Sequence, residues 1–308
     1  MLYKKKWPLV VFLVPGLLFM LVFLYIPFVQ NIKNSFYDMT AIIEMPGTEW
    51  KFIGFENYKK LFTDPDVRTA LINSLKMMVL TVIFEVGIAF VLAVMVSQIK
   101  KLQQLFRTVY FFPVVISATA IGLLFKLFYK YNGGMLNQIL ESIGAKPVNW
   151  LSPSLAFIMV CIPTLWSYIG FYFVILLTGL SDIPDDIYEA ASIDGCSRFK
   201  QVFYITLPMM KPVFFTSVTL AVTGALKVFD LPWVMVPNGA PQGLTHFLGT
   251  YMYQQTFGLN NYDYGSTLAV LIVVLGIVVS KAVGFLTADA DDKEAKKRAR
   301  AEKKKGVA

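Results

Sequence analysis

Six apolar segments, each long enough to cross a lipid bilayer, constrain this 308-residue chain more than any other feature. A transmembrane helix needs about 20 mostly apolar residues, and inside hydrocarbon the backbone must satisfy its own hydrogen bonds. Each segment is therefore predicted to be an α-helix. Only 16% of the residues are charged, against roughly a quarter in a soluble domain. The predicted spans are 8–29, 71–97, 109–129, 155–180, 213–236 and 266–286.

The distribution of Lys and Arg between the spans predicts the orientation. One side of the membrane holds 17 of these residues near the span ends and the other side holds 7. Cytoplasmic loops carry the excess of positive charge, so we predict an all-α membrane protein with six transmembrane helices and both termini cytoplasmic. The predicted parts are a first helix with an extracytoplasmic loop (1–70), a five-helix core (71–286) and a basic cytoplasmic tail (287–308). The chain has a net charge of +8. Because the positive residues gather near the span ends on one side, we expect them to contact anionic membrane lipid and not nucleic acid.

The segment 181–212, which joins the fourth and fifth spans on the cytoplasmic side, is too polar to cross a membrane. Its sequence predicts two short helices. Ser181 or Asp182 can cap the first helix, and Gly195 can end it in a left-handed conformation. Ser197 can cap the second. The loop is therefore expected to be a folded unit.

One face of the first short helix is apolar, although the helix lies on the cytosolic side. Ile183, Ile187, Ala190 and Ala191 share this face, and Glu189 lies beside it. Such a face can dock another protein, or it can pack against the membrane domain of its own chain. The residues alone leave both interpretations open.

The same loop carries a long family signature. Glu189-Ala190-Ala191, then Gly195, then Ile205-Thr206-Leu207-Pro208 resembles the EAA motif of ABC importer permeases, with every anchor at the family's spacing. The stretch from Ile183 to Gly195 is similar to the carbohydrate branch, and the whole arrangement to the maltose-type first permease. A departure occurs at Val236–Pro241, where the family has a TGGGP-like turn.

The resemblance implies a type I importer permease fold and a set of roles. In the family the helix before the glycine is a coupling helix that sits in a cleft of the ATPase subunit. The residues that the resemblance assigns to this coupling are Ile187, Tyr188, Glu189, Ala190, Ala191, Asp194 and Gly195.

The partners that the resemblance implies are a second homologous permease, an ATPase dimer, an extracytoplasmic solute-binding protein and a carbohydrate substrate. The chain is then a multi-pass cell-membrane protein that forms half of the translocation path for a sugar or oligosaccharide. The sequence lacks a G-x4-G-K-[ST] phosphate-binding loop. We therefore expect that this chain is not an enzyme and that it holds no cofactor or metal. ATP and Mg²⁺ are expected to bind to the partner ATPase.

Ionisable residues inside the spans are candidates for the substrate path, because burying a charge in a membrane is costly. Lys227 and Asp230 are three residues apart and can form a structural ion pair, while Glu85 can hydrogen-bond a neighbouring helix. Aromatic side chains can stack on a sugar ring or simply pack. The substrate-path candidates are Glu85, Tyr168, Thr223, Lys227, Asp230 and Trp233.

Two other functions fit the same composition less well. A membrane-embedded transferase needs clustered acids or a metal site, and no His or Cys pair accompanies the one dense acidic group. An importer for glycerol phosphate, polyols or another small solute is the alternative within transport. The spans contain few cations, which favours a neutral sugar. The acidic group comprises Asp182, Asp185, Asp186 and Asp194.

Overall fold

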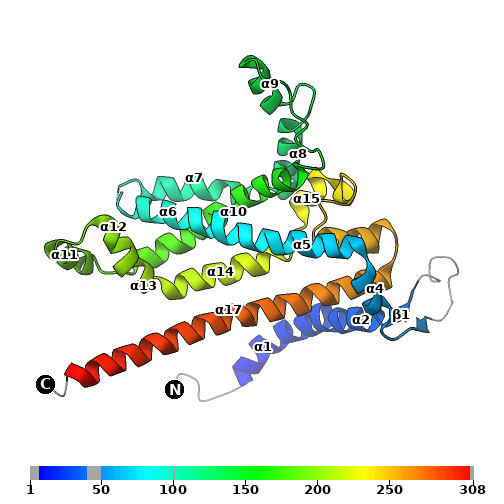
Figure 1. Cartoon of the computed structure of the whole chain (residues 1–308). Coiled ribbons are helices and arrows are strands. Elements are labelled where there is room, and N and C mark those ends of the chain that lie inside the picture. Colours follow the sequence, from blue (N-terminus) through cyan, green and yellow to red (C-terminus); the bar gives the residue numbers. More distant parts are fainter. Residues whose placement is uncertain (1–6, 40–49, 100, 306–308) are drawn as a thin grey trace.

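The computed structural model describes residues 7–39, 50–99 and 101–305. Over this part of the chain, long helices lie side by side in an elongated bundle, with a two-stranded ribbon at one end (Figure 1). Five helical segments are long and apolar enough to cross a membrane, and a strongly bent helix pair supplies a sixth. The predicted helical membrane fold is confirmed, and the predicted six spans are reached when the bent pair is counted as one span.

Four of the predicted spans coincide with unbroken helical segments. The first comprises α1 (Trp7–Met20), the π-helical turn η1 (Leu21–Tyr25) and α2 (Ile26–Asn34). The second comprises α5 (Pro65–Leu80), the π-helical turn η2 (Thr81–Val86) and α6 (Gly87–Ser97). The fourth is α10 (Ala156–Ser181), and the sixth is α17 (Tyr262–Lys305), which continues without a break into the basic tail.

The third predicted span, 109–129, is wrong as a single straight helix. The two helices in its place, α7 (Gln103–Val115) and α8 (Ala118–Phe128), meet at an angle of 87°. Pro113 removes one backbone hydrogen bond from the last turn of α7, which weakens that turn. Ile116 is then extended, and the Ser117 hydroxyl caps the first turn of α8.

The fifth predicted span, 213–236, is interrupted at residues 226–229, which are not helical. Its two parts are α14 (Lys211–Ala225) and α15 (Asp230–Met235). Pro232 has no backbone N–H, so a helix running through it would lose a hydrogen bond, whereas a proline in the first turn of a new helix loses none. The break therefore follows from one residue.

The remaining elements connect the spans. At one end are β1 (Tyr37–Asp38), which pairs antiparallel with β2 (Lys51–Phe52), and α4 (Glu56–Thr63). At the other are α11 (Asp185–Ile193), α12 (Arg198–Gln201), the π-helical turn η3 (Val202–Thr206) and α13 (Leu207–Met209). Beyond the bent and broken spans lie α9 (Met135–Ser142), η4 (Pro237–Gly239), α16 (Leu248–Tyr253) and η5 (Gln254–Gly258).

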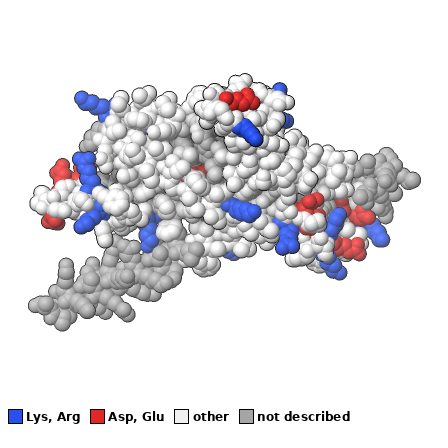
Figure 2. All heavy atoms as spheres, turned by 45° about the horizontal axis from the view of Figure 1, so that its top comes forward, with Lys and Arg blue, Asp and Glu red and all other residues white. Residues whose placement is uncertain are grey.

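The two ends of the bundle differ in what they carry. Figure 1 shows α11, α12 and the carboxyl end of α17 at one end, with α4 and β1 at the other. The loop 181–212 and the basic tail, both predicted to be cytoplasmic, therefore lie at the same end. Figure 2 shows charged side chains mostly at the two ends of the molecule and on the projecting α8–α9 arm, with a largely uncharged middle. This pattern suits a protein whose middle lies in hydrocarbon.

Asp64 ties three elements together at the end of the bundle that carries α4 and β1. Its carboxylate caps α5 by accepting hydrogen bonds from the backbone N–H groups of Asp66 (2.9 Å) and Val67 (3.3 Å). It also accepts the hydroxyl groups of Tyr251 in α16 and Tyr264 in α17, each at 2.7 Å. Burial raises the pKa of Asp64, but the hydrogen bonds outweigh burial and hold its pKa below the usual value.

The substitution Asp64→Asn is expected to destabilise the fold by about 1–3 kcal/mol at neutral pH, because the acceptor loses its charge. A carboxyl whose pKa is lower in the folded chain stabilises above its unfolded pKa, and this stabilisation is lost as the pH falls through the folded pKa. The thermal midpoint of the wild-type chain in detergent should therefore drop below about pH 4, and part of that drop should be missing in the variant. Equal midpoints at neutral pH would contradict this role.

Candidate functional site

A cavity of about 310 Å³ lies between the second, third, fourth and fifth spans. The bundle has two clusters of buried apolar side chains, and both contribute to the lining: Ile121 and Leu231 belong to one, Tyr172 and Ala221 to the other. The cavity therefore lies where the two clusters meet. Four of the predicted substrate-path residues line it: Glu85, Tyr168, Lys227 and Asp230.

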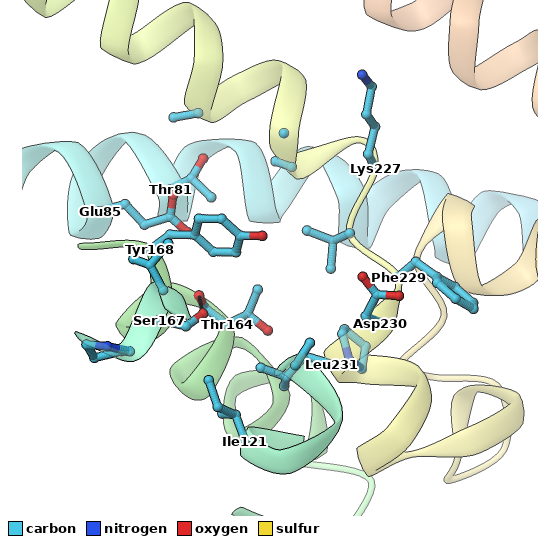
Figure 3. A pocket seen from close by; sticks show the side chains of 18 of the residues that line it. Thr81, Glu85, Ile121, Thr164, Ser167, Tyr168, Lys227, Phe229, Asp230 and Leu231 are labelled. Carbon is cyan, nitrogen blue, oxygen red and sulfur yellow. Dashed lines mark hydrogen bonds between the residues drawn. The ribbon is translucent and has the colours of Figure 1, made fainter. Parts of the chain in front are cut away.

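Glu85 occupies the inner part of this cavity. It belongs to η2, a π-helical turn of a kind that is frequent at functional sites. Its side chain is only 3% exposed and lies beside Tyr168 (Figure 3). Among the described residues it makes no hydrogen bond, so the expected bond to a neighbouring helix is not formed. A carboxyl group buried without a partner at membrane depth is a functional candidate.

The predicted ion pair between Lys227 and Asp230 is wrong. Lys227 lies within the non-helical break in the fifth span and Asp230 is the first residue after it, so the helical spacing that would have brought them together is lost. Figure 3 shows the Lys227 side chain pointing away from the cavity and the Asp230 carboxylate lying at its edge. Both residues are exposed on the surface of the chain. Because exposed charges are costly against lipid, this face is unsuited to contact hydrocarbon.

Two predicted substrate-path residues lie outside the lining. The Thr223 hydroxyl donates to the backbone oxygen of Thr219 at 2.7 Å, within its own helix. Trp233 packs against aromatic neighbours, with ring centroids 5.9 Å from Phe229 and 4.8 Å from Tyr253. The structure supports the packing interpretation for Trp233.

Three serine or threonine side chains line the cavity without having been predicted: Thr81, Thr164 and Ser167. A signal for two of them was present, because Thr164, Ser167 and Tyr168 recur at helical spacing within an apolar run and therefore share one face. Thr81 precedes Glu85 by four residues and shares its face for the same reason. Polar residues that line up along an apolar span are thus the feature that sequence reasoning missed.

The loop 181–212 forms two short helices, as predicted, but its caps differ. Ser181 is the last residue of α10 and Asp182 follows it, so neither caps α11, which begins after Pro184. Gly195 has φ of +75°, the left-handed conformation predicted for the residue that ends this helix. Ser197 stands at the cap position of α12 without a side-chain capping bond.

Gln201 holds the two short helices together. Its side-chain nitrogen donates to the Ser192 hydroxyl at 2.9 Å and to the backbone oxygen of Cys196 at 3.2 Å. The hydroxyl groups of Tyr188 and Thr206 also meet, at 3.0 Å. These contacts make α11, Gly195 and α12 a single rigid unit.

The apolar face predicted on this loop is partly wrong. Ile183 is buried and Ile187 is half-buried, and both pack against the apolar cluster of their own membrane domain. The face turned outward instead presents Ala190 and Ile193, and Ile193 is 86% exposed. Further exposed apolar side chains follow on α12 and η3. They are Phe199, Phe203 and Tyr204.

The remaining predicted coupling residues divide in the same way. Tyr188 is half-buried against the membrane domain and Ala191 is partly exposed, whereas Glu189 and Asp194 are exposed. The loop therefore has an inner face that anchors it and an outer face that is free in the single chain. The predicted packing against the membrane domain is confirmed for the inner face, and docking of another protein to the outer face stays a prediction.

Comparison with known proteins identifies the class. A family model described as the binding-protein-dependent transport system inner membrane component matches residues 85–288. The probable ABC transporter permease protein YurN of Bacillus subtilis (strain 168) is 34% identical over 274 residues, which cover 87% of this chain and 92% of YurN. The arabinooligosaccharides transport system permease protein AraP of the same strain is 31% identical over 282 residues, or 90% and 88% of the two chains.

The fold agrees with a solved transporter. A chain of the bacterial ABC transporter involved in the import of the acidic polysaccharide alginate superposes with a TM-score of 0.81 at 22% identity, over 93% of this chain and 96% of that one. The resemblance inferred from the EAA-like loop is thus confirmed, as is the expectation of a non-catalytic, multi-pass subunit of the inner membrane. The chain belongs to the family of binding-protein-dependent transport system inner membrane components, and it is a permease subunit of an ABC importer.

Proposed function

We propose that this permease forms half of the translocation path of an ATP-driven importer for a sugar or oligosaccharide, with the 310 Å³ cavity as part of that path. The relative AraP is named as a permease protein of an arabinooligosaccharides transport system. The lining of hydroxyl, carboxyl and aromatic side chains suits such a solute, since sugar hydroxyls both donate and accept hydrogen bonds. The broken fifth span beside it supports the proposal, because discontinuous helices form the solute sites of many transporters.

A second permease subunit is proposed to cover the face onto which the cavity opens. Lys227 and Asp230 are exposed there at membrane depth. Against lipid they would be costly, whereas a water-filled path between two permeases removes that cost. The solved alginate transporter has been crystallised with a pentasaccharide-bound periplasmic protein, and we propose a solute-binding protein as the extracytoplasmic partner here as well.

We propose that the outer face of α11 receives the movement of a partner ATPase. The exposure of this face in the single chain is the observation that carries the proposed function furthest. The proposed contact residues are Glu189, Ala190, Ile193 and Asp194, and Gly195 sets the direction of the chain that follows. Ile187, Tyr188 and Ala191 anchor the helix to the membrane domain. ATP and Mg²⁺ belong to the ATPase in this proposal.

Affinity purification of the chain from native membranes in mild detergent tests this assignment. We expect the wild-type chain to bring down an ATPase and a second permease. Gly195→Pro should lose the ATPase but keep the second permease, because proline cannot adopt the positive φ found there. Glu189→Ala, an exposed position, should reduce ATPase recovery without changing the amount of folded permease. An ATPase retained in full by both variants would place its docking site elsewhere.

A further inference from the structure

Glu85 is the one carboxyl group that is buried among the described residues of the cavity lining. Its side chain is 3% exposed, whereas Lys227 and Asp230, which also line the cavity, are exposed. It forms no hydrogen bond and no ion pair with any described residue. An ionised carboxylate buried without a partner is so costly that the group binds a proton instead. Glu85 is therefore a neutral carboxylic acid at neutral pH, with an O–H donor and a carbonyl acceptor side by side.

The polar side chains around Glu85 leave both of these atoms unused. Thr81, one helical turn before it, donates its hydroxyl hydrogen to a backbone oxygen at 2.9 Å. On the fourth span, Thr164 and Ser167 also donate to backbone oxygens of their own helix, at 3.0 and 2.8 Å. Tyr168 lies beside Glu85 (Figure 3), and no hydrogen bond joins the two side chains. The donor and the acceptor of Glu85 are thus available to a solute in the cavity.

A buried carboxyl group of this kind weakens the fold, because a polar group without a hydrogen bond has lost its hydration and gained nothing in return. A leucine of similar size would pack at this position without that cost. Proteins retain such destabilising residues where activity needs them. The position of Glu85 in the cavity lining therefore indicates a role toward a ligand.

We propose that Glu85 determines the specificity of the path by binding two neighbouring hydroxyl groups of the solute. Its O–H donates to one hydroxyl, and its carbonyl oxygen accepts a hydrogen from the other. Adjacent free hydroxyls are a feature of sugars and polyols, and a site built to bind them rejects analogues in which one is missing. The inference rests on the proposed role of the cavity as a translocation path, and it adds the chemical group by which the solute is recognised.

Two variants separate this role from a structural one. Glu85→Gln keeps a donor and an acceptor side by side, because a primary amide offers both, whereas Glu85→Leu removes them. We expect the thermal midpoint of the purified Glu85→Leu permease to equal or exceed that of the wild type, since an unpartnered polar group is lost. The infrared spectrum of the wild-type importer at neutral pH should contain the carbonyl band of a protonated carboxyl group, and both variants should lack it.

Either of two results in these measurements would overturn the proposal. A midpoint lowered in Glu85→Leu and restored in Glu85→Gln would show that Glu85 bonds within the permease. Absence of the protonated-carboxyl band from the wild type would show that Glu85 has no hydrogen to donate.

Uptake by intact cells tests the contact with the solute. A strain without the permease gene is complemented with the wild type or a variant at equal amounts of assembled importer. The probes are radiolabelled neutral pentose and hexose mono-, di- and trisaccharides, with maltose, lactose, trehalose and arabinotriose among them. For a sugar whose uptake needs the permease, Glu85→Leu should lower the maximal rate by at least about tenfold, the effect of two lost hydrogen bonds. The KM should not change, because the proposed solute-binding protein captures the sugar first, and Glu85→Gln should retain most of the rate.

Monodeoxy analogues of the transported sugar identify the recognised hydroxyl groups. The wild type should transport at least one analogue more slowly than the parent sugar, and Glu85→Leu should not distinguish the two, as in a double-mutant cycle. Discrimination that persists in Glu85→Leu, or a maximal rate that is unchanged in Glu85→Leu or lowered equally in both variants, would overturn the role of Glu85 while leaving the path intact. Permease-dependent uptake of no sugar in the panel would instead overturn the proposed sugar import.

Discussion

The substitution Gly170→Ala is expected to destabilise the membrane domain by about 3 kcal/mol, at the upper end of the usual cost of overpacking. Gly170 in α10 lies directly against the backbone of α7, and a methyl group there would overlap the carbonyl oxygen of Tyr110 and the Cα of Phe111. Backbone atoms cannot rotate away as a side chain can, so the two helices must separate. Small residues allow this close approach between transmembrane helices.

The measurement is the thermal midpoint of the purified chain in detergent, together with its monodisperse fraction in size-exclusion chromatography. Gly276→Ala is the matched control, because a methyl group at this position in α17 meets only one side-chain atom, at 4.0 Å. We expect the control to behave like the wild type and Gly170→Ala to lose most of the monodisperse protein. Equal midpoints for the two variants would show that α7 and α10 are not held at this distance.

The substitution Ile193→Asp is expected to disconnect the permease from its ATPase while leaving the membrane domain folded. Ile193 is 86% exposed in the single chain, so its replacement removes no packing within the permease. If a partner covers it, the loss of one buried aliphatic side chain costs about 2 kcal/mol, or roughly thirtyfold in affinity. Burial of the introduced carboxylate adds to this cost.

Co-purification and solute-stimulated ATP hydrolysis check this result, with thermal unfolding to show that the permease itself is unchanged. Ile193→Leu keeps the apolar area and should retain the ATPase. Ile187→Asp provides a contrast, because Ile187 packs against the membrane domain and its replacement should lower the thermal midpoint. Full ATPase activity in Ile193→Asp would mean that the outer face of α11 is not covered by the partner.

Properties that depend on the composition of a single segment were determined by the sequence. Six apolar runs of about 20 residues or more predicted membrane-crossing helices, because a helix satisfies its own backbone hydrogen bonds inside the bilayer. The excess of Lys and Arg on one side predicts the orientation. Gly195 specified the end of α11, since its φ of +75° is a conformation that glycine adopts without strain. The family followed from the spacing of residues within one loop.

Properties that depend on how distant segments meet were decided only by the tertiary structure. The helix break ahead of Pro232 separated Lys227 from Asp230, although their spacing predicted a pair. Packing against the membrane domain turned Ile187 inward and left Ile193 outside, although both are isoleucines on one helix. A sequence records which side chains are apolar or charged, but burial and partners are set by neighbours that come from other parts of the chain. The cavity is therefore visible only in the assembled bundle, because four different spans line it.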